Sequence, residues 1–255
     1  MTAALSPRLT AATTSRVLRQ LRHDRRTVAM LLVLPGALLG LLYLIWSEIP
    51  PAPGQPETFD RVGLTMLGVF PFVVMFLVTS IAMLRERTSG TLERLLTTPL
   101  SRPELLLGYG AAFGLAAAVQ ALVTVTVAAT VYDLDVAGPL ALVVLIAVAD
   151  AVLGVALGLL ASAFASSEFQ AVQLMPVVVL PQFFLCGLLV PREQLAGWLQ
   201  VAGDVLPLTY AVDALQEVGG STAATGTMWV DVGVVSGAAL LALGLAAATL
   251  RRRTS

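Results

Sequence analysis

The stretch VGLTMLGVFPFVVMFLVTSIAML, residues 62–84, contains no charged side chain. A helix rises about 1.5 Å per residue and the hydrocarbon core of a bilayer is about 30 Å thick, so about 20 apolar residues cross it. An element buried in a soluble protein does not need so long an uncharged run. The stretch therefore predicts a membrane-spanning helix.

Five similar runs accompany it. The expected spans are residues 27–46, 62–84, 105–132, 139–165, 169–190 and 229–250. Of the 255 residues, 57% are hydrophobic and 12% are charged, about half the charged share of a soluble domain. We predict an all-α membrane protein, with a six-helix transmembrane domain over residues 27–250 between a segment 1–26 and a tail 251–255. Gly154 and Gly158 form a Gly-x-x-x-Gly pattern, which is typical of close helix packing but does not identify the partner helix.

The 15 basic residues are all Arg, and their distribution predicts the orientation. Six lie in residues 1–26, four between the second and third spans, and three in the tail, whereas the other connections hold only Arg61 and Arg192. Because basic residues stay on the cytoplasmic side, both chain ends are predicted to be cytoplasmic. Residues 1–26 further predict an amphipathic helix, capped by Ser15, that lies along the inner leaflet.

The residue types that the chain lacks exclude several functions. Without Lys it has neither a P-loop for ATP nor a Schiff-base nucleophile. A single histidine, His23, and a single cysteine, Cys186, do not build a zinc site or an internal disulfide. An intramembrane enzyme would need clustered acids or paired His in the spans, and none is visible. We therefore predict no catalytic residue and no metal ligand, and we do not expect an enzyme.

The charged connection after the second span reads RERTSGTLERLLTTPLSRPELLLG over residues 85–108. We expect a helical turn, a hinge at Gly90, a second short helix and a turn at Pro99. Ser101 and Glu104 have the spacing of a capping box, which starts the third span. On physical grounds alone, this segment is a solvated loop followed by a well-capped helix.

The same segment resembles the cytoplasmic loop of type 2 ABC exporter permeases. That family often shows an acidic residue, a Gly-Thr-Leu-Glu string and a Thr-Pro-Leu string. The matching positions here are Glu86, Gly90, Thr91, Leu92, Glu93, Leu95, Leu96, Thr98, Pro99 and Leu100. In the family, this loop folds into a coupling helix that docks on a separate ATPase subunit. The resemblance implies that role for Glu86, Gly90, Thr91, Leu92, Glu93, Arg94, Leu95 and Pro99.

A second block downstream matches the same family in the expected order. It comprises Cys186-Gly187, Pro191, Trp198 and the string Pro207-Leu208-Thr209-Tyr210, followed by Asp213 and Leu215. The resemblance implies an extracytoplasmic gate region that contains Gly187, Pro191, Trp198, Pro207, Thr209 and Tyr210. Residues 191–209 are expected to form a re-entrant or interfacial helical pair, and an ordinary amphipathic loop is the alternative.

The resemblance covers nearly the whole chain and is nearest to daunorubicin-resistance-type drug-exporter permeases. It implies the transmembrane subunit of an ATP-driven exporter in the cytoplasmic (inner) membrane, moving a hydrophobic or amphipathic substrate such as a drug, lipid or glycolipid. The expected partners are a separate P-loop ATP-binding cassette subunit, a second copy or a paralogous permease, and membrane lipid, without nucleic acid. The chain itself is expected to bind no cofactor, because the ATPase subunit binds ATP and Mg. The alternative is a secondary transporter, although no inverted repeat is evident.

Polar side chains within the spans are the remaining candidates. Asp150 is the one acid deep in a span, and Gln120 lies at the same calculated depth on the third span, so we expect a hydrogen bond between them. A substrate or ion role for Asp150 stays open beside this structural role. Gln173 and Gln182 in the fifth span are candidates for lining a pathway, and hydrogen bonding within the bundle is the alternative.

We expect Glu93→Arg to uncouple transport from ATP hydrolysis without preventing membrane insertion, because the resemblance assigns Glu93 to the ATPase contact. Transport by reconstituted protein, compared with its amount in the membrane fraction, checks this expectation. Normal transport by the variant would refute the docking role.

Overall fold

The computed structural model describes residues 6–49, 58–91 and 101–249, and every regular element in these ranges is helical. In chain order the elements are α1 (Pro7–His23), α2 (Arg25–Trp46), α3 (Thr58–Thr88), α5 (Arg102–Val131), α6 (Leu140–Ser162), α7 (Glu168–Leu185), the 3-10 turn η1 (Arg192–Gln194), α8 (Gly197–Val205), α9 (Pro207–Gly220) and α10 (Gly226–Thr249). Within the described ranges, α2, α3, α5, α6, α7 and α10 are long and apolar enough to cross a membrane. The predicted all-α architecture with six spans is confirmed.

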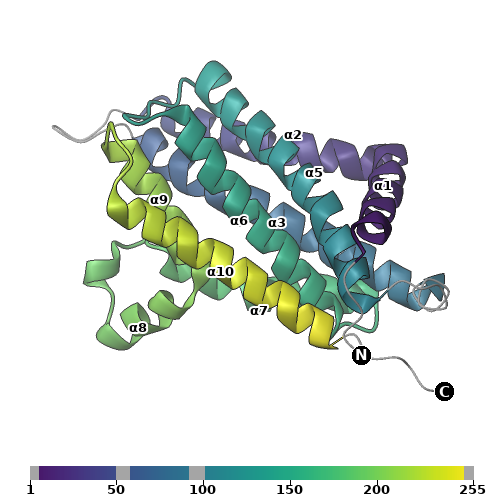
Figure 1. Ribbon diagram of the computed structural model, residues 1–255. Coiled ribbons are helices and arrows are strands. Elements are labelled where there is room, and N and C mark those ends of the chain that lie inside the picture. The colour runs from purple at the N-terminus through teal and green to yellow at the C-terminus, as the bar shows by residue number, and fades with distance from the viewer. Residues whose placement is uncertain (1–5, 50–57, 92–100, 250–255) are drawn as a thin grey trace.

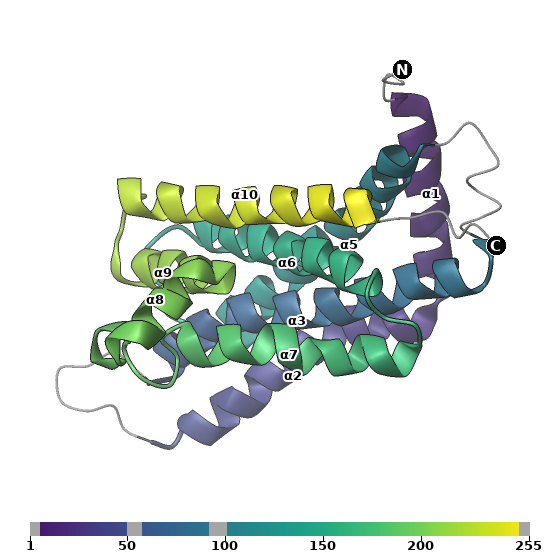
Figure 2. The ribbon, with the colours of Figure 1, turned by 90° about the horizontal axis from the view of Figure 1, so that it is seen from below.

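The long helices run side by side and give the molecule two ends (Figure 1). One end holds α1, the end of α3 and the start of α5, and we call it the basic end because Arg residues gather there. The other end holds α8, α9 and the connection between α5 and α6, and we call it the α8–α9 end. Helix α1 crosses the spans instead of running alongside them (Figure 2). This is the arrangement of a helix that lies along a membrane surface.

Helix α3 is the centre of the bundle. In its most apolar stretch 72% of the residues are buried, against 17% in α7. It packs against α2, α5, α6, α7 and α9, and its contact with α6 is the most extensive. The uncharged run at residues 62–84 therefore forms both a membrane span and the core of the protein.

Two glycines of α6 allow α3 and α6 to approach closely. A Cβ at Gly154 would lie 2.4 Å from the carbonyl oxygen of Phe72, and a Cβ at Gly158 would lie 2.6 Å from that of Phe76. Carbon and oxygen atoms that are not bonded do not come so close, so no larger residue fits without a backbone shift. The Gly-x-x-x-Gly pattern thus sets the spacing between these two helices.

Several helix boundaries differ by a few residues from the sequence predictions, and three of the differences have a clear physical meaning. Helix α7 ends at Leu185 and not at residue 190, because Gly187 adopts a left-handed backbone conformation (φ 89°) that turns the chain. Helix α3 continues beyond residue 84 to Thr88, so the second span carries charged residues on its own last turn. The predicted cap at Ser15 is wrong, since α1 already begins at Pro7, a residue suited to the first turn of a helix.

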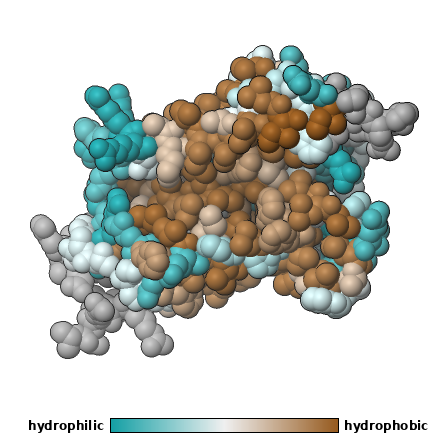
Figure 3. Space-filling view, turned by 180° about the vertical axis from the view of Figure 1, so that it is seen from behind, coloured by the Kyte–Doolittle hydropathy of each residue, from teal (hydrophilic) through white to brown (hydrophobic). Residues whose placement is uncertain are grey.

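A broad apolar band covers the middle of the surface, between more polar ends (Figure 3). On α2, for example, Val33 and Leu44 are 63% and 69% exposed, and on α10 Leu240 is 70% exposed. Soluble monomers rarely expose contiguous apolar surface of this extent. The band is therefore a surface for lipid or for another membrane protein.

We expect Gly154→Ala to destabilise the protein by about 1–3 kcal/mol, because the added methyl group meets backbone atoms of α3 that cannot rotate away. Gly244→Ala on α10 is the matched control, since a Cβ there has no neighbour within 4 Å. Thermal unfolding in detergent is followed with a thiol-reactive dye, because the single cysteine, Cys186, is 1% exposed in the folded chain. Equal unfolding temperatures for the two variants would contradict the close α3–α6 packing.

Candidate functional site

The segment with the exporter-like strings begins where α3 ends and stops where α5 begins. Gly90 has a left-handed conformation (φ 73°), which agrees with the predicted hinge, and a Cβ there would have no neighbour within 4 Å. The next described residues belong to the start of α5. The predicted coupling residues that lie outside the described residues are Leu92, Glu93, Arg94, Leu95 and Pro99. The geometry of the site is therefore that of the two flanking helix ends.

Glu86, on the last turn of α3, lies in a cluster with α1 and α5. Arg16 of α1 forms an ion pair with Glu86 at 3.1 Å and donates a hydrogen bond to the Tyr109 hydroxyl at 2.8 Å. Its guanidinium carbon also lies 5.7 Å from the centre of the Tyr109 ring, within cation–π range. The side chains of Arg16 and Glu86 are 27% and 13% exposed. The cluster thus joins three helices through a charge pair that is partly removed from water, where charges attract more strongly.

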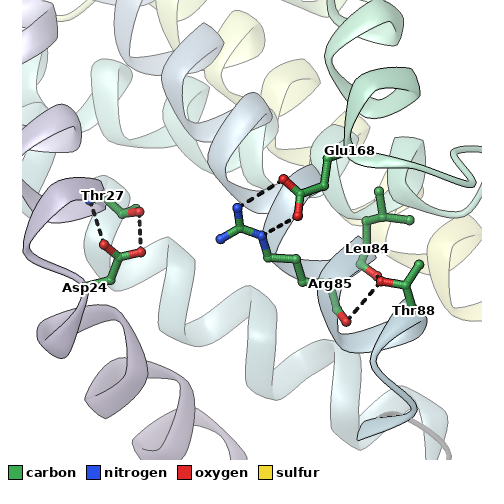
Figure 4. A network of polar contacts seen from close by, with 6 residues as sticks. All are labelled: Asp24, Thr27, Leu84, Arg85, Thr88 and Glu168. Carbon is green, nitrogen blue, oxygen red and sulfur yellow. Dashed lines mark hydrogen bonds and ion pairs between the residues drawn. The ribbon is translucent and has the colours of Figure 1, made fainter.

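Two further contacts hold the same end of α3. Arg85 forms a bidentate ion pair with Glu168 at the start of α7, with nitrogen–oxygen distances of 2.7 and 3.1 Å (Figure 4). Arg87 donates a hydrogen bond to the carbonyl oxygen of Ser162 at the end of α6. The Arg85–Glu168 pair is 60% and 54% exposed, so it contributes little to stability. Together these contacts tie the end of α3 to α1, α6 and α7.

The start of α5 is held by one carboxylate. Ser101 and Glu104 form the predicted capping box, in which the Glu104 side chain accepts a hydrogen bond from the Ser101 N–H at 2.7 Å. Glu104 also accepts one at 2.6 Å from the N–H of Ser6, immediately before α1, and it is 3% exposed. It therefore joins the N-termini of α1 and α5, where both helix dipoles favour a negative charge.

Helix α1 packs directly on α5. A Cβ at Gly108 would lie 2.6 Å from the side chain of Thr13, so the glycine makes room for α1. The Thr14 hydroxyl donates a hydrogen bond to the Gly108 carbonyl at 3.2 Å. Because α1 also contacts the end of α3 through Arg16, it bridges the two helix ends that residues 92–100 connect. We call α1 the strap for this reason.

A groove of about 770 Å³ opens between α1, α2, α3 and α5 beside these contacts. Apolar side chains such as Val78 and Phe113 line it together with the charged Asp24, Arg85 and Glu86. Sites that bind small molecules combine apolar walls with a few polar groups in this way. The groove is thus suited to an amphipathic molecule.

At the α8–α9 end, the Pro-Leu-Thr-Tyr string forms the corner between α8 and α9. Pro207 is the first residue of α9, where the missing N–H costs no helical hydrogen bond. The Thr209 hydroxyl donates to the carbonyl oxygen of Gly203 at 3.0 Å, and the Tyr210 hydroxyl donates to that of Asp204 at 2.6 Å. The string therefore closes an α8–α9 hairpin.

Charged and amide side chains attach this hairpin to its surroundings. Gln182 of α7 is buried, donates to the carbonyl oxygen of Val178 at 2.9 Å and accepts from the backbone N–H of Leu208 at 3.3 Å. Arg192 pairs with both Asp204 and Asp213. Burial raises the pKa of Asp213, and the positive charge of Arg192 opposes that shift. The contacts link α7, η1, α8 and α9.

A cavity of about 1070 Å³ lies beside the hairpin, with walls from α2, α3, α9 and the α7–α8 connection. Of the predicted gate residues, Gly187 and Pro191 line this cavity. Thr209 is fully buried, whereas Trp198 on α8 is 74% exposed. The structure thus brings part of the predicted gate region together and leaves Trp198 outside it.

The polar residues predicted within the spans differ in their burial and in their hydrogen bonds. Asp150 and Gln120 are fully buried, but the hydrogen bond predicted between them is not formed, and neither side chain has a partner in the described ranges. One Asp150 carboxylate oxygen lies 3.3 Å from the Cβ position of Gly68, so Asp150 faces α3. Equal depth fixes the height of a residue but not the direction of its side chain. Gln173 is exposed on α7.

Comparison with known proteins gives the family. The family model described as ABC-2 type transporter matches residues 8–218, from the strap to the α8–α9 hairpin. The chain belongs to the ABC-2 type transporter family. It is accordingly a multi-pass membrane protein.

Two curated relatives agree with this family membership. ABC transporter G family member 20 of Dictyostelium discoideum is 27% identical over 176 residues, which cover 68% of this chain and 24% of that protein. The probable multidrug ABC transporter permease YbhR of Escherichia coli K12 is 27% identical over 165 residues, which cover 65% of this chain and 45% of that protein. The chain thus spans less than half the length of these two relatives.

For this ABC-2 family member, the sequence predicts Glu86, Glu104 and the capping partner Ser101, but not the partners of the two carboxylates at α1. Arg16 lies 70 positions from Glu86, and Ser6 lies 98 positions from Glu104. A single sequence holds no signal for pairs so far apart. Covariation between two positions across related sequences is the kind of signal that identifies such contacts.

We expect Arg16→Ala to destabilise the protein by about 1.5–3 kcal/mol, because it leaves the mostly buried Glu86 carboxylate without its charged hydrogen-bond donor. Glu168→Ala breaks the exposed pair with Arg85 and is expected to cost about 0–1 kcal/mol. Unfolding followed through the Cys186 thiol measures both. Equal losses of unfolding free energy in the two variants would show that the more buried Arg16–Glu86 pair stabilises the protein no more than the exposed Arg85–Glu168 pair does.

Proposed function

We propose that the chain is the transmembrane subunit of an ATP-driven exporter of hydrophobic or amphipathic molecules, such as drugs, lipids or glycolipids. The relative named as a probable multidrug permease favours this class of cargo. A separate P-loop ATP-binding cassette subunit binds ATP and Mg, since this chain contains no Lys for a P-loop. The basic end faces the cytoplasm, on the distribution of Arg residues. Two copies, or one copy and a paralogous permease, form the complete pathway.

One observation carries the proposal: the two helix ends that flank residues 92–100 are both tied to the bundle. The end of α3 contacts α1, α6 and α7, and the start of α5 contacts α1 through Glu104. Helix ends held in this way pass a displacement on to the helices they contact, because they cannot move alone. Such helix ends suit a contact with an ATPase subunit that changes shape when it binds nucleotide.

The α8–α9 hairpin has the complementary role at the other end. It closes the far side of the bundle, and Arg192 holds it through Asp204 and Asp213. The adjoining cavity of about 1070 Å³ is large enough for a drug-sized molecule. We assign the release of substrate to this end, with Gly187 and Pro191 at the cavity wall and the Pro207–Tyr210 corner as the fixed point of the hairpin.

A secondary transporter is the other candidate. Such carriers usually have discontinuous helices whose ends meet substrate or ions near the membrane midplane. Although α7 contains Pro176 and Pro181, it remains one helix from Glu168 to Leu185. Asp150 has no basic partner in the described part of the chain. These features favour an ATP-driven exporter over a secondary transporter.

The direct test reconstitutes the chain into vesicles with and without a P-loop ATPase subunit that co-purifies with it. We expect transport of a fluorescent amphipathic compound to require both the subunit and hydrolysable ATP. Transport by the chain alone, driven by an ion gradient, would replace this proposal with the secondary transporter.

Glu104→Ala is expected to reduce transport several-fold per ATP hydrolysed while the ATPase subunit stays bound, because it releases Ser6 and Ser101 together. Ser15→Ala is the control, at an exposed position of α1 away from this contact. Transport and ATP hydrolysis are measured on the same vesicles. If Glu104→Ala transports as much substrate per ATP hydrolysed as the wild type, the strap does not transmit motion from the ATPase subunit to the spans.

A further inference from the structure

We propose that the outward face of α1, continued at the start of α2, is a docking surface for the headgroups of anionic phospholipids. The surface consists of Arg8, Arg19, Arg22, Arg25 and Arg26, and all five side chains are exposed. It binds the membrane leaflet at the basic end, which is the cytoplasmic leaflet on the topology proposed above. The inference depends on that topology and not on the identity of the exported substrate.

The position of these side chains around α1 defines the surface. Thr13 and Val17 are 6% and 3% exposed and mark the side of α1 that faces the protein. At 3.6 residues per turn, Arg8, Arg19 and Arg22 lie about 140° to 180° around the helix from Val17. They therefore point away from the bundle, and replacing them removes no internal packing.

The surface lacks neutralising charges of its own. In the described ranges Arg16 is paired with Glu86, but none of the five surface Arg residues forms an ion pair. Asp24, the one acid in the same stretch, caps α2 and accepts hydrogen bonds from the Thr27 N–H and hydroxyl (Figure 4). Those bonds hold the pKa of Asp24 below its usual value. The surface is therefore open to an anion from outside the described part of the chain.

The surface also lies at the depth of lipid headgroups. The exposed apolar side of α2 begins at Met30, which is 42% exposed. Arg26 precedes Met30 by four residues, or about 6 Å along the helix. Helix α1 crosses the spans at this same end (Figure 2). In a membrane of this orientation, lipid phosphate groups therefore lie within reach of these guanidinium groups.

A shallow groove of about 660 Å³ along α1 favours a lipid over a soluble anion or an acidic protein. Its lining combines the apolar Pro7, Ala11 and Leu18 with Arg19 and Arg22. Arg side chains on amphipathic helices lay their apolar stems along the membrane and direct the charge to the headgroups. A phospholipid offers both the apolar chain and the phosphate, whereas an inorganic anion offers the charge alone.

Lipid binding at this surface has a mechanical consequence. The strap joins the start of α5 through Ser6 and the end of α3 through Arg16. A headgroup that bridges Arg19 and Arg22 holds the strap against the membrane. Anionic lipid therefore fixes the position of the element that connects both ends of residues 92–100.

The test compares the wild type with Arg19→Gln/Arg22→Gln in phosphatidylcholine nanodiscs titrated with phosphatidylglycerol. Native mass spectrometry of the full chain counts the phosphatidylglycerol molecules that remain bound. We expect the double variant to bind phosphatidylglycerol about 25-fold more weakly, since each basic residue near an anionic membrane surface contributes about 1 kcal/mol. Phosphatidylcholine binding is expected to stay unchanged, as is unfolding measured through Cys186.

Arg61→Gln, which removes an Arg at the α8–α9 end, is the charge control and is expected to leave phosphatidylglycerol binding unchanged. Wild-type affinity in the double variant, or an equal loss in Arg61→Gln, overturns the proposal. So does a double variant that keeps its lipid but no longer binds the ATPase subunit, because the surface is then a protein contact. Lipid binding is measured on the permease alone, so its failure is distinct from a failure of ATP-driven transport.

Discussion

The interior of a bilayer offers no hydrogen-bond partner, and this constraint governs the whole structure. Each span satisfies its backbone within a helix, and apart from the buried Asp150 the acidic and basic side chains gather towards the two ends of the bundle. In the middle, helices attract one another mainly by packing, so the glycines of α6 determine how closely it meets α3. At the ends, water and charge allow specific pairs to form, such as those of Arg16 with Glu86 and of Arg192 with Asp213.

The two ends are built alike, because at each end short helices outside the spans contact several of the long helices. At the basic end the strap α1 connects α3 to α5 through Arg16 and Ser6. At the opposite end the α8–α9 hairpin connects to α7 through Gln182 and to η1 through Arg192. A change at one end reaches the other through the long helices, since little backbone between them is irregular.

The spans could be predicted because an uncharged run has only one stable form in lipid, as residues 62–84 illustrate. The capping box of Ser101 and Glu104 was equally predictable, because its partners are three residues apart. The pair of Arg16 and Glu86 was not, since it depends on how α1 folds back over the bundle. The direction of Asp150 also escaped prediction, because depth along a helix leaves its rotation undetermined. The sequence therefore predicts elements and their order well, and contacts between distant elements poorly.

The backbone contact between α3 and α6 has a consequence for motion. Two helices whose main chains touch at Phe72 and Phe76 have no side-chain layer between them that can rearrange. They must move as one rigid body. Helices α2, α7 and α10 have far fewer buried residues, and they can slide across that body at smaller energetic cost. Any displacement of the peripheral helices would therefore be a shear over a stiff central pair.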